Sequence, residues 1–128
     1  MSDRIREILV PLPFSDTLDR LSAAILKSGM TIFATIDHAA GARQVGLHMP
    51  PTTVFIYGSP KGGTPAMLSV PNAALDLPLR VLVRDSGNGE TVIAFHPVGT
   101  ILRTLGVPEE SASRLETAQN LLMDGVLS

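Results

Sequence analysis

The chain has 128 residues, of which 45% are hydrophobic and 17% are charged. This length suits one domain, and the apolar content is too high for intrinsic disorder. Ten Lys and Arg residues against twelve Asp and Glu residues give a formal net charge of -2, without the basic excess of a nucleic-acid or anionic-membrane binder. The absence of cysteine excludes disulfides, thiolate metal sites and thiol nucleophiles.

The sequence predicts a cytoplasmic protein. Its N-terminus is charged, and Pro11 and Pro13 interrupt the apolar stretch that follows, so we expect no signal peptide. No segment approaches the roughly 20 apolar residues of a membrane-spanning helix. The mean hydropathy of +0.28 indicates apolar surface left for a partner, and we expect a homodimer.

The N-terminal part of the chain predicts two strands with a helix between them. Residues 5–12 are rich in Ile, Leu and Val and predict the first strand. Ser15 or Asp16 is expected to cap a helix that ends at Gly29. Residues 30–37 alternate in polarity and predict the second strand. One face of that strand would carry Met30, Ile32, Ala34 and Ile36.

The middle of the chain predicts a central strand between two helices. Residues 39–46 favour a short helix, and the β-branched and aromatic run at 53–57 predicts a strand covered on both faces. A glycine-rich loop over residues 58–63 follows. Thr64 before Pro65 then predicts the start of the next helix, as a hydroxyl cap followed by proline.

The C-terminal part predicts a β-hairpin and two helices. Residues 79–84 and 91–95 form the hairpin around a glycine-rich turn. A short helix over 99–105 and a longer one from Pro108 to Gly125 complete the chain. This order predicts an α+β fold: a single two-layer domain with a mixed β-sheet of about five strands and helices packed mainly on one face.

Four segments occur in a characteristic order, at residues 36–42, 54–61, 65–68 and 75–83, before the hairpin closes at Phe95. Their order and spacing resemble the bacterial and archaeal family called domain of unknown function 302, over about residues 16–105. The most specific parts are Gly-Ser-Pro-Lys at 58–61 and Asp-Leu-Pro-Leu-Arg at 76–80. The resemblance implies a compact α/β domain with a mixed sheet, and it implies no reaction.

The glycine-rich loop is a candidate anion site. Gly58 and Gly63 have phosphate-loop spacing, but Thr64 and Pro65 stand where that motif needs Lys and Ser or Thr, which speaks against an NTPase. Free backbone N–H groups at a helix start would still favour an anion. The alternative is a connection whose glycines serve only the backbone. The candidate ligand-binding residues are Ser59, Lys61, Gly62, Gly63, Thr64 and Arg80.

A second candidate is an acid–base site. His38 follows a strand end, and we expect Asp76 rather than the adjacent Asp37 to orient it, because neighbouring strand residues point to opposite faces. Lys61 would stabilise negative charge in the same cleft. The structural alternative is that Asp37 caps the next helix and His38 packs at the sheet edge. Asp76 would then pair with Arg80 or Lys61, or accept bonds in a turn.

Other chemistries find little support in the sequence. His38, His48 and His96 lack metal-ligand spacing, and neither a nucleophile elbow nor a dinucleotide fingerprint is present. We therefore expect no metal and no cofactor. The favoured interpretation is a module that binds a small anionic ligand and associates with itself. The alternative is a small enzyme that uses His38, Asp76 and Lys61.

Overall fold

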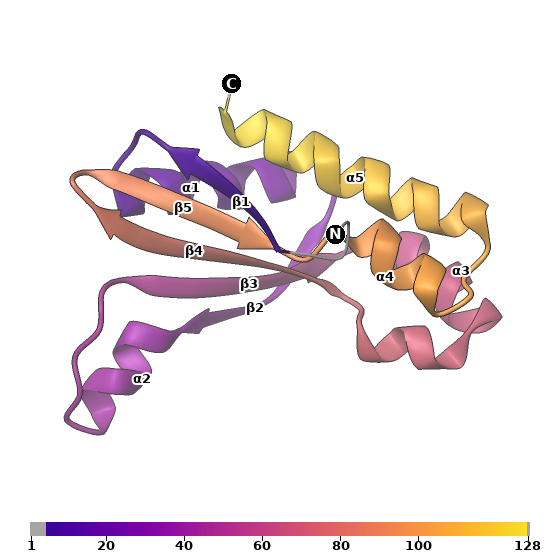
Figure 1. The fold of residues 1–128 in the computed structure, drawn as a ribbon, viewed down its shortest axis with the longest axis horizontal. Coiled ribbons are helices and arrows are strands. Elements are labelled where there is room, and N and C mark those ends of the chain that lie inside the picture. Colours follow the sequence, from indigo (N-terminus) through magenta and orange to yellow (C-terminus); the bar gives the residue numbers. More distant parts are fainter. Residues whose placement is uncertain (1–4, 128) are drawn as a thin grey trace.

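The computed structural model describes residues 5–127, which contain one five-stranded sheet (Figure 1). Its strands follow the order β1-β5-β4-β3-β2, and every neighbouring pair is antiparallel. The strands are β1 (Arg6–Val10), β2 (Thr31–Asp37), β3 (Thr52–Gly58), β4 (Leu79–Gly87) and β5 (Glu90–Phe95).

The α+β class is confirmed, but the expectation of a mixed sheet is wrong. The first connection carries the chain from β1 at one edge of the sheet to β2 at the other edge. The strands β1 and β2 run in the same direction, yet they never become neighbours. Every later strand turns back beside the one before it, so all observed pairs are antiparallel.

The helices gather mainly on one face of the sheet and at one of its ends (Figure 1). The long helices α1 and α5 contact each other, and α5 also contacts α3 and α4. No helix within residues 5–127 is long and apolar enough to cross a membrane. The helices are α1 (Phe14–Lys27), α2 (His38–Gln44), α3 (Pro60–Ser69), the 3-10 helix η1 (Pro71–Leu75), α4 (Val98–Thr104) and α5 (Glu109–Leu127).

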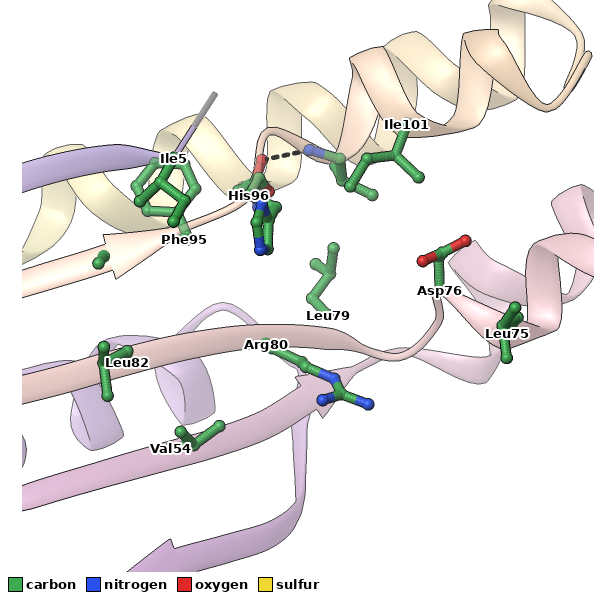
Figure 2. Close-up of a pocket in the computed structure, with 13 residues that line it drawn as sticks. Ile5, Val54, Leu75, Asp76, Leu79, Arg80, Leu82, Phe95, His96 and Ile101 are labelled. Atoms are coloured by element: carbon green, nitrogen blue, oxygen red, sulfur yellow. Dashed lines mark hydrogen bonds between the residues drawn. The ribbon is translucent and has the colours of Figure 1, made fainter. Parts of the chain in front are cut away.

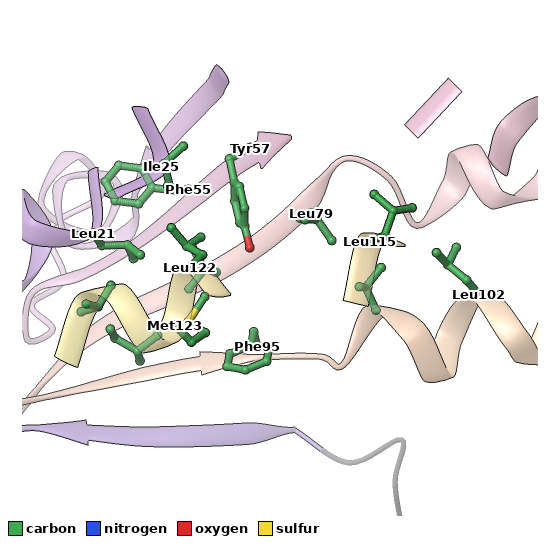
Figure 3. Close-up of a cluster of buried hydrophobic side chains, with 14 of the residues drawn as sticks. Leu21, Ile25, Phe55, Tyr57, Leu79, Phe95, Leu102, Leu115, Leu122 and Met123 are labelled. Atoms are coloured by element: carbon green, nitrogen blue, oxygen red, sulfur yellow. The ribbon is translucent and has the colours of Figure 1, made fainter. Parts of the chain in front are cut away.

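The hydrophobic core lies between the sheet and the helices α1 and α5 (Figure 3). Alternate residues of the central strands point into it, and the C-terminal helix is therefore part of the core layer. Tyr57 is fully buried there, and burial raises the pKa of its hydroxyl. Other large buried side chains are Leu21, Ile25, Phe55, Val81, Val83, Ile93, Leu102, Leu122 and Met123.

Two predicted helix boundaries differ from the structure, and one agrees with it. The first helix begins at Phe14, and the Pro13 carbonyl accepts from the Thr17 N–H at 3.0 Å, so the cap lies two residues before Ser15 and three before Asp16. The last helix continues through Gly125 to its end at Leu127. The helix end at Gly29 is confirmed, with a positive φ of 82°.

The second strand also departs from simple alternation. A register shift between Ile32 and Ala34 places a bulge at Phe33. Ile32 pairs with the core residue Tyr57, whereas Ala34 pairs with Ile56 on the opposite face. The single face predicted for the even-numbered residues is therefore divided between the two sides of the sheet.

Candidate functional site

The principal cleft opens where β4 and β5 separate. These strands are paired from their hairpin down to Leu82 opposite Ala94, where the ladder ends. Beyond this point β4 continues to Leu79 beside β3, and β5 continues to Phe95 beside β1. A cleft of about 450 Å³ lies at this separation, and we call it the fork cleft (Figure 2).

Apolar side chains form most of the fork cleft, and three titratable side chains border it. Asp76 follows η1, Arg80 lies on β4, and His96 joins β5 to α4. All three residues are solvent-exposed. The remaining lining residues are Ile5, Val54, Leu75, Leu79, Leu82, Ala94, Phe95, Val98, Ile101 and Gln119.

The alternation of β4 places Arg80 at this cleft. Leu79, Val81 and Val83 point into the core, so Arg80 points to the opposite face of the sheet. Within residues 5–127, Arg80 makes no ion pair with Asp76. The guanidinium therefore borders an apolar cleft with its donors available.

A buried glutamine holds the wall of the cleft in place. Gln119 on α5 is 2% exposed. Its Oε1 accepts from the Val98 N–H at 3.0 Å, and its Nε2 donates to the His96 carbonyl at 3.1 Å. These two bonds fix the backbone between β5 and α4, from which the His96 side chain extends.

The structure does not bring His38 and Asp76 into one cleft. His38 directly follows Asp37, which pairs with Thr53 at the start of β3, whereas Asp76 lies near Leu79, which pairs with Tyr57 close to the other end of β3. Thr53 and Tyr57 are four residue steps apart along β3, a distance of about 13 Å. Successive connections of an antiparallel sheet lie at alternate ends, so the β2–β3 and β3–β4 connections are far apart (Figure 1).

The structural alternative for Asp37 is confirmed. Its Oδ1 accepts from the Ala40 N–H at 2.9 Å and caps α2. His38 is the exposed first residue of that helix. Asp76 differs, because no ion pair joins it to Lys61 or Arg80 in the described part of the chain.

The glycine-rich segment belongs to α3 and forms no open anion loop. The helix begins at Pro60, and the N–H groups of Gly62 and Gly63 donate to the Ser59 carbonyl at 3.0 and 2.9 Å. The predicted helix start at Thr64 is wrong, because Pro60 fills the first helical position, where a missing N–H costs nothing. Thr64 lies inside the helix, and its backbone offers no helix-start donor.

A second cavity of about 280 Å³ lies beside α3, and we call it the α3 cavity. Leu79 lines both cavities. The predicted ligand-binding residues are divided between them: Arg80 borders the fork cleft, Lys61 borders neither, and the rest border the α3 cavity. The predicted residues that border the α3 cavity are Ser59, Gly62, Gly63 and Thr64.

Sequence reasoning missed His96 and Gln119. His96 follows the returning strand of the predicted hairpin and precedes Pro97, a strand-end position like that of His38. Its spacing from the other histidines predicts no metal site, and no further motif marks it. Gln119 carries no signal in the sequence, because its role depends on how α5 packs against the end of β5.

Known proteins match part of this chain in sequence, and a solved structure matches its fold. Two proteins called fluoride-specific ion channel FluC 1, from Brucella suis biovar 1 (strain 1330) and Brucella abortus biovar 1 (strain 9-941), are 40% identical to it over 76 residues. The match covers 59% of this chain and only 30% and 28% of those proteins. The chain thus matches less than a third of the length of these curated relatives.

A solved structure shares the whole architecture. The crystal structure of an uncharacterized conserved protein DUF302 from Bacillus stearothermophilus superposes with a TM-score of 0.83 at 17% identity, and the alignment covers 95% of this chain and 97% of that one. The family model described as domain of unknown function DUF302 matches residues 7–124. This range extends beyond residues 16–105, over which the sequence resembles the family, and takes in most of β1 and most of α5. The chain belongs to the DUF302 family.

Proposed function

We propose that this chain binds a small molecule with an anionic group in the fork cleft. The observation that carries the proposal is Arg80, an arginine without a carboxylate partner in the described chain, at the border of an apolar cleft. A guanidinium presents planar donors that match a carboxylate or a phosphate. The cleft volume of about 450 Å³ lies within the range of small-molecule sites.

The other polar residues narrow the class of ligand. The His96 imidazole offers a donor or an acceptor near the anion. The carboxylate of Asp76 repels a second negative charge and accepts a hydrogen bond from a ligand hydroxyl or amine. The apolar walls favour a ligand whose remaining part is hydrophobic. A monoanion with an apolar body and one donor group fits this arrangement better than a compact polyanion.

The enzyme alternative has less support. The described residues that line the fork cleft include no serine, threonine or lysine, so His96 has no neighbouring hydroxyl or amine to activate. His38, the expected acid or base, lies near the other end of the sheet. Binding without reaction is the function that this cleft favours.

Fluoride, which the names of the Brucella relatives suggest, is a test case for the proposal. A fluoride ion is a single atom, and the fork cleft holds about 450 Å³ with largely apolar walls. Such a site favours a ligand of many atoms. We expect carboxylates with an apolar body to bind more tightly than fluoride.

The proposal is tested by thermal shift and calorimetry on the whole chain at constant ionic strength. The probes are butyrate, phenylacetate, inorganic phosphate and sodium fluoride. A ligand that binds only the folded state raises its stability by about 2.7 kcal/mol at a hundred times its Kd. Arg80→Ala should abolish the shift that the carboxylates give. Arg84→Ala is the matched control, because Arg84 lies on the same strand, pairs with Glu7 at 3.1 Å and does not line the cleft.

Two results would overturn the proposal. One is carboxylate binding by Arg80→Ala that equals binding by the wild type. The other is binding that Lys61→Ala abolishes, which would return the site to the start of α3. A panel without any binding would show that the cleft takes none of these anions.

Self-association stays a prediction from hydropathy. On the sheet face opposite the core, Leu9 and Ile36 are 57% and 40% exposed beside the half-buried Val54 and Leu82. Sedimentation over a wide concentration range measures the oligomeric state. A monomer throughout that range would contradict the expected homodimer.

A further inference from the structure

We infer that the fork cleft and the α3 cavity together bind one amphipathic anion, with its head at Arg80 and its apolar tail beside α3. The inference rests on the proposed function, because it takes the anion site at Arg80 as given. It adds the class of ligand: a carboxylate or phosphate that carries an unbranched hydrocarbon chain. Three features of the structure support it.

The first feature is the composition of the α3 cavity. Its only charged lining residue is Arg114, and that guanidinium already pairs with Glu110 at 3.0 Å. No unpaired charge faces this cavity among its lining residues, so it suits a hydrocarbon group and does not suit a second anion. Its apolar lining consists of Met30, Phe33, Pro60, Met67, Leu77, Pro78, Leu79, Leu115 and Ala118.

The second feature is the glycine pair that keeps the cavity open. A Cβ at Gly62 would lie 3.6 Å from Leu115 Cδ2, and one at Gly63 would lie 3.8 Å from Met67 Cε. Glycine is unfavourable inside a helix, yet side chains here would extend into the space between α3 and α5. Two methionines also border the cavity, and their flexible chains adapt to ligands of differing shape.

The third feature is the wall between the two cavities. Leu79 lines both of them and is 5% exposed. Figure 2 shows its side chain within the fork cleft between His96 and Asp76, and Figure 3 shows it near Leu115. Because the β4–β5 ladder ends at Leu82, Leu79 pairs with β3 alone. The Leu79 side chain is therefore part of the wall that both cavities share, and a ligand that spans them must displace it.

The test is a chain-length series measured by calorimetry on the whole chain, with butyrate, hexanoate, octanoate and octyl phosphate below their micelle concentrations. Burial of each added methylene should tighten binding about fourfold, which corresponds to about 0.8 kcal/mol. The affinity should stop rising when the α3 cavity is full. Octanoate and octyl phosphate distinguish a carboxylate head from a phosphate head.

Two variants locate the tail. Gly63→Ala adds a methyl group at ordinary contact distance from Met67 and Leu77, so the helix accepts it. It should weaken octanoate binding several-fold and leave butyrate binding unchanged. The matched control is Gly41→Ala on α2, where a Cβ meets no atom within 4 Å. This control makes the same helical substitution far from both cavities.

The outcomes separate the inference from the proposed function. Affinity that is independent of chain length, with butyrate binding still lost in Arg80→Ala, would overturn the inference and leave the proposed function in place. Equal weakening by Gly63→Ala and Gly41→Ala would also overturn the inference. Octanoate binding that Gly63→Ala weakens and Arg80→Ala does not would contradict the proposed anion site itself.

Discussion

The two ends of the sheet differ in how their polar groups are satisfied. At the end that carries α2 and the β4–β5 hairpin, side chains bond to nearby backbone: Asp37 caps α2, Asp85 Oδ1 accepts from the Gly87 N–H at 2.9 Å, and Thr91 Oγ1 donates to the Leu12 carbonyl at 2.8 Å. At the end where β4 and β5 separate, Asp76 and Arg80 form no ion pair within residues 5–127. Asp37 and Asp85 are therefore structural at one end, whereas Asp76 at the other end has no ion-pair partner in the described chain.

The largest effect on stability is expected from Gln119, which holds the wall of the fork cleft. Gln119→Ala leaves the buried Val98 N–H without its acceptor and the His96 carbonyl without its donor. The free energy of unfolding should fall by about 2–4 kcal/mol, since each unsatisfied buried group costs roughly 1–3 kcal/mol. Urea denaturation measures it. Gln119→Met separates packing from hydrogen bonding, and a Gln119→Met protein as stable as the wild type would contradict the role of these bonds.

Two aspartates make the comparison of the two ends direct. Asp37→Ala removes the cap of α2 and should lower the free energy of unfolding by about 1 kcal/mol. Asp37→Asn keeps a side-chain acceptor for the cap and should retain most of that stability. Asp76→Ala should change stability by less than about 0.5 kcal/mol, because this carboxylate makes no ion pair in the described chain. Chemical denaturation of the three variants measures these values. A loss at Asp76 as large as that at Asp37 would assign Asp76 a structural role.

Local patterns made the elements predictable, and the arrangement of the connections made the site unpredictable. The hairpin, the short helix after Asp37 and its cap depend on neighbouring residues, and the sequence predicts all of them. The joint position of His38 and Asp76 depends on strand order, which places their two connections at opposite ends. The start of α3 was ambiguous for another reason, because both Pro60 and Pro65 suit a first helical position.

The separation of β4 and β5 could not be predicted either, because it depends on the arrangement of distant segments. Beyond Ala94 the strand β5 pairs with β1 alone, and the chain then enters α4, which packs on α5. His96 and Gln119 thus line the fork cleft through contacts between distant segments. Arg80 was predictable as a charged residue on the face of a strand opposite the core, although its place at a cleft was not.

A smaller effect of opposite sign is expected at Tyr57, the chain's only tyrosine. Its hydroxyl is buried without a hydrogen-bond partner in the described chain. Tyr57→Phe should therefore raise the free energy of unfolding by about 0.5–1 kcal/mol. Urea denaturation at neutral pH tests this, and a clear loss of stability would show that the hydroxyl has a partner, such as a bound water.

The pH dependence at Tyr57 follows from burial, which raises the pKa of the hydroxyl above its usual value of about 10. Above that pH the unfolded chain loses this proton while the folded chain keeps it. The unfolded state then binds fewer protons, so stability falls as pH rises. Wild type should lose more stability than Tyr57→Phe between neutral pH and strongly alkaline pH. Parallel profiles for the two proteins would contradict a raised pKa.

The smallest effect is expected at Arg103, the paired counterpart of Arg80 at the same end of the sheet. Arg103 on α4 donates from Nε to Glu109 Oε1 at 2.9 Å and from Nη2 to Glu116 Oε1 at 3.0 Å. These bonds lower the pKa of Glu109 to about 2 and also lower that of Glu116. Their contribution is present above the usual glutamate pKa and is lost as pH falls toward about 2. The groups are solvent-exposed, so salt weakens the network.

A double-mutant cycle with Arg103→Gln and Glu109→Gln, measured by urea denaturation, isolates this coupling. It should be small at neutral pH and low salt, and it should vanish both at high salt and well below pH 2. A coupling that persists well below pH 2 would contradict this expectation, because protonation of Glu109 should remove the ion pair. Arg103→Gln should leave ligand binding at Arg80 unchanged, because a guanidinium already bound by two carboxylates has few donors left for an anion.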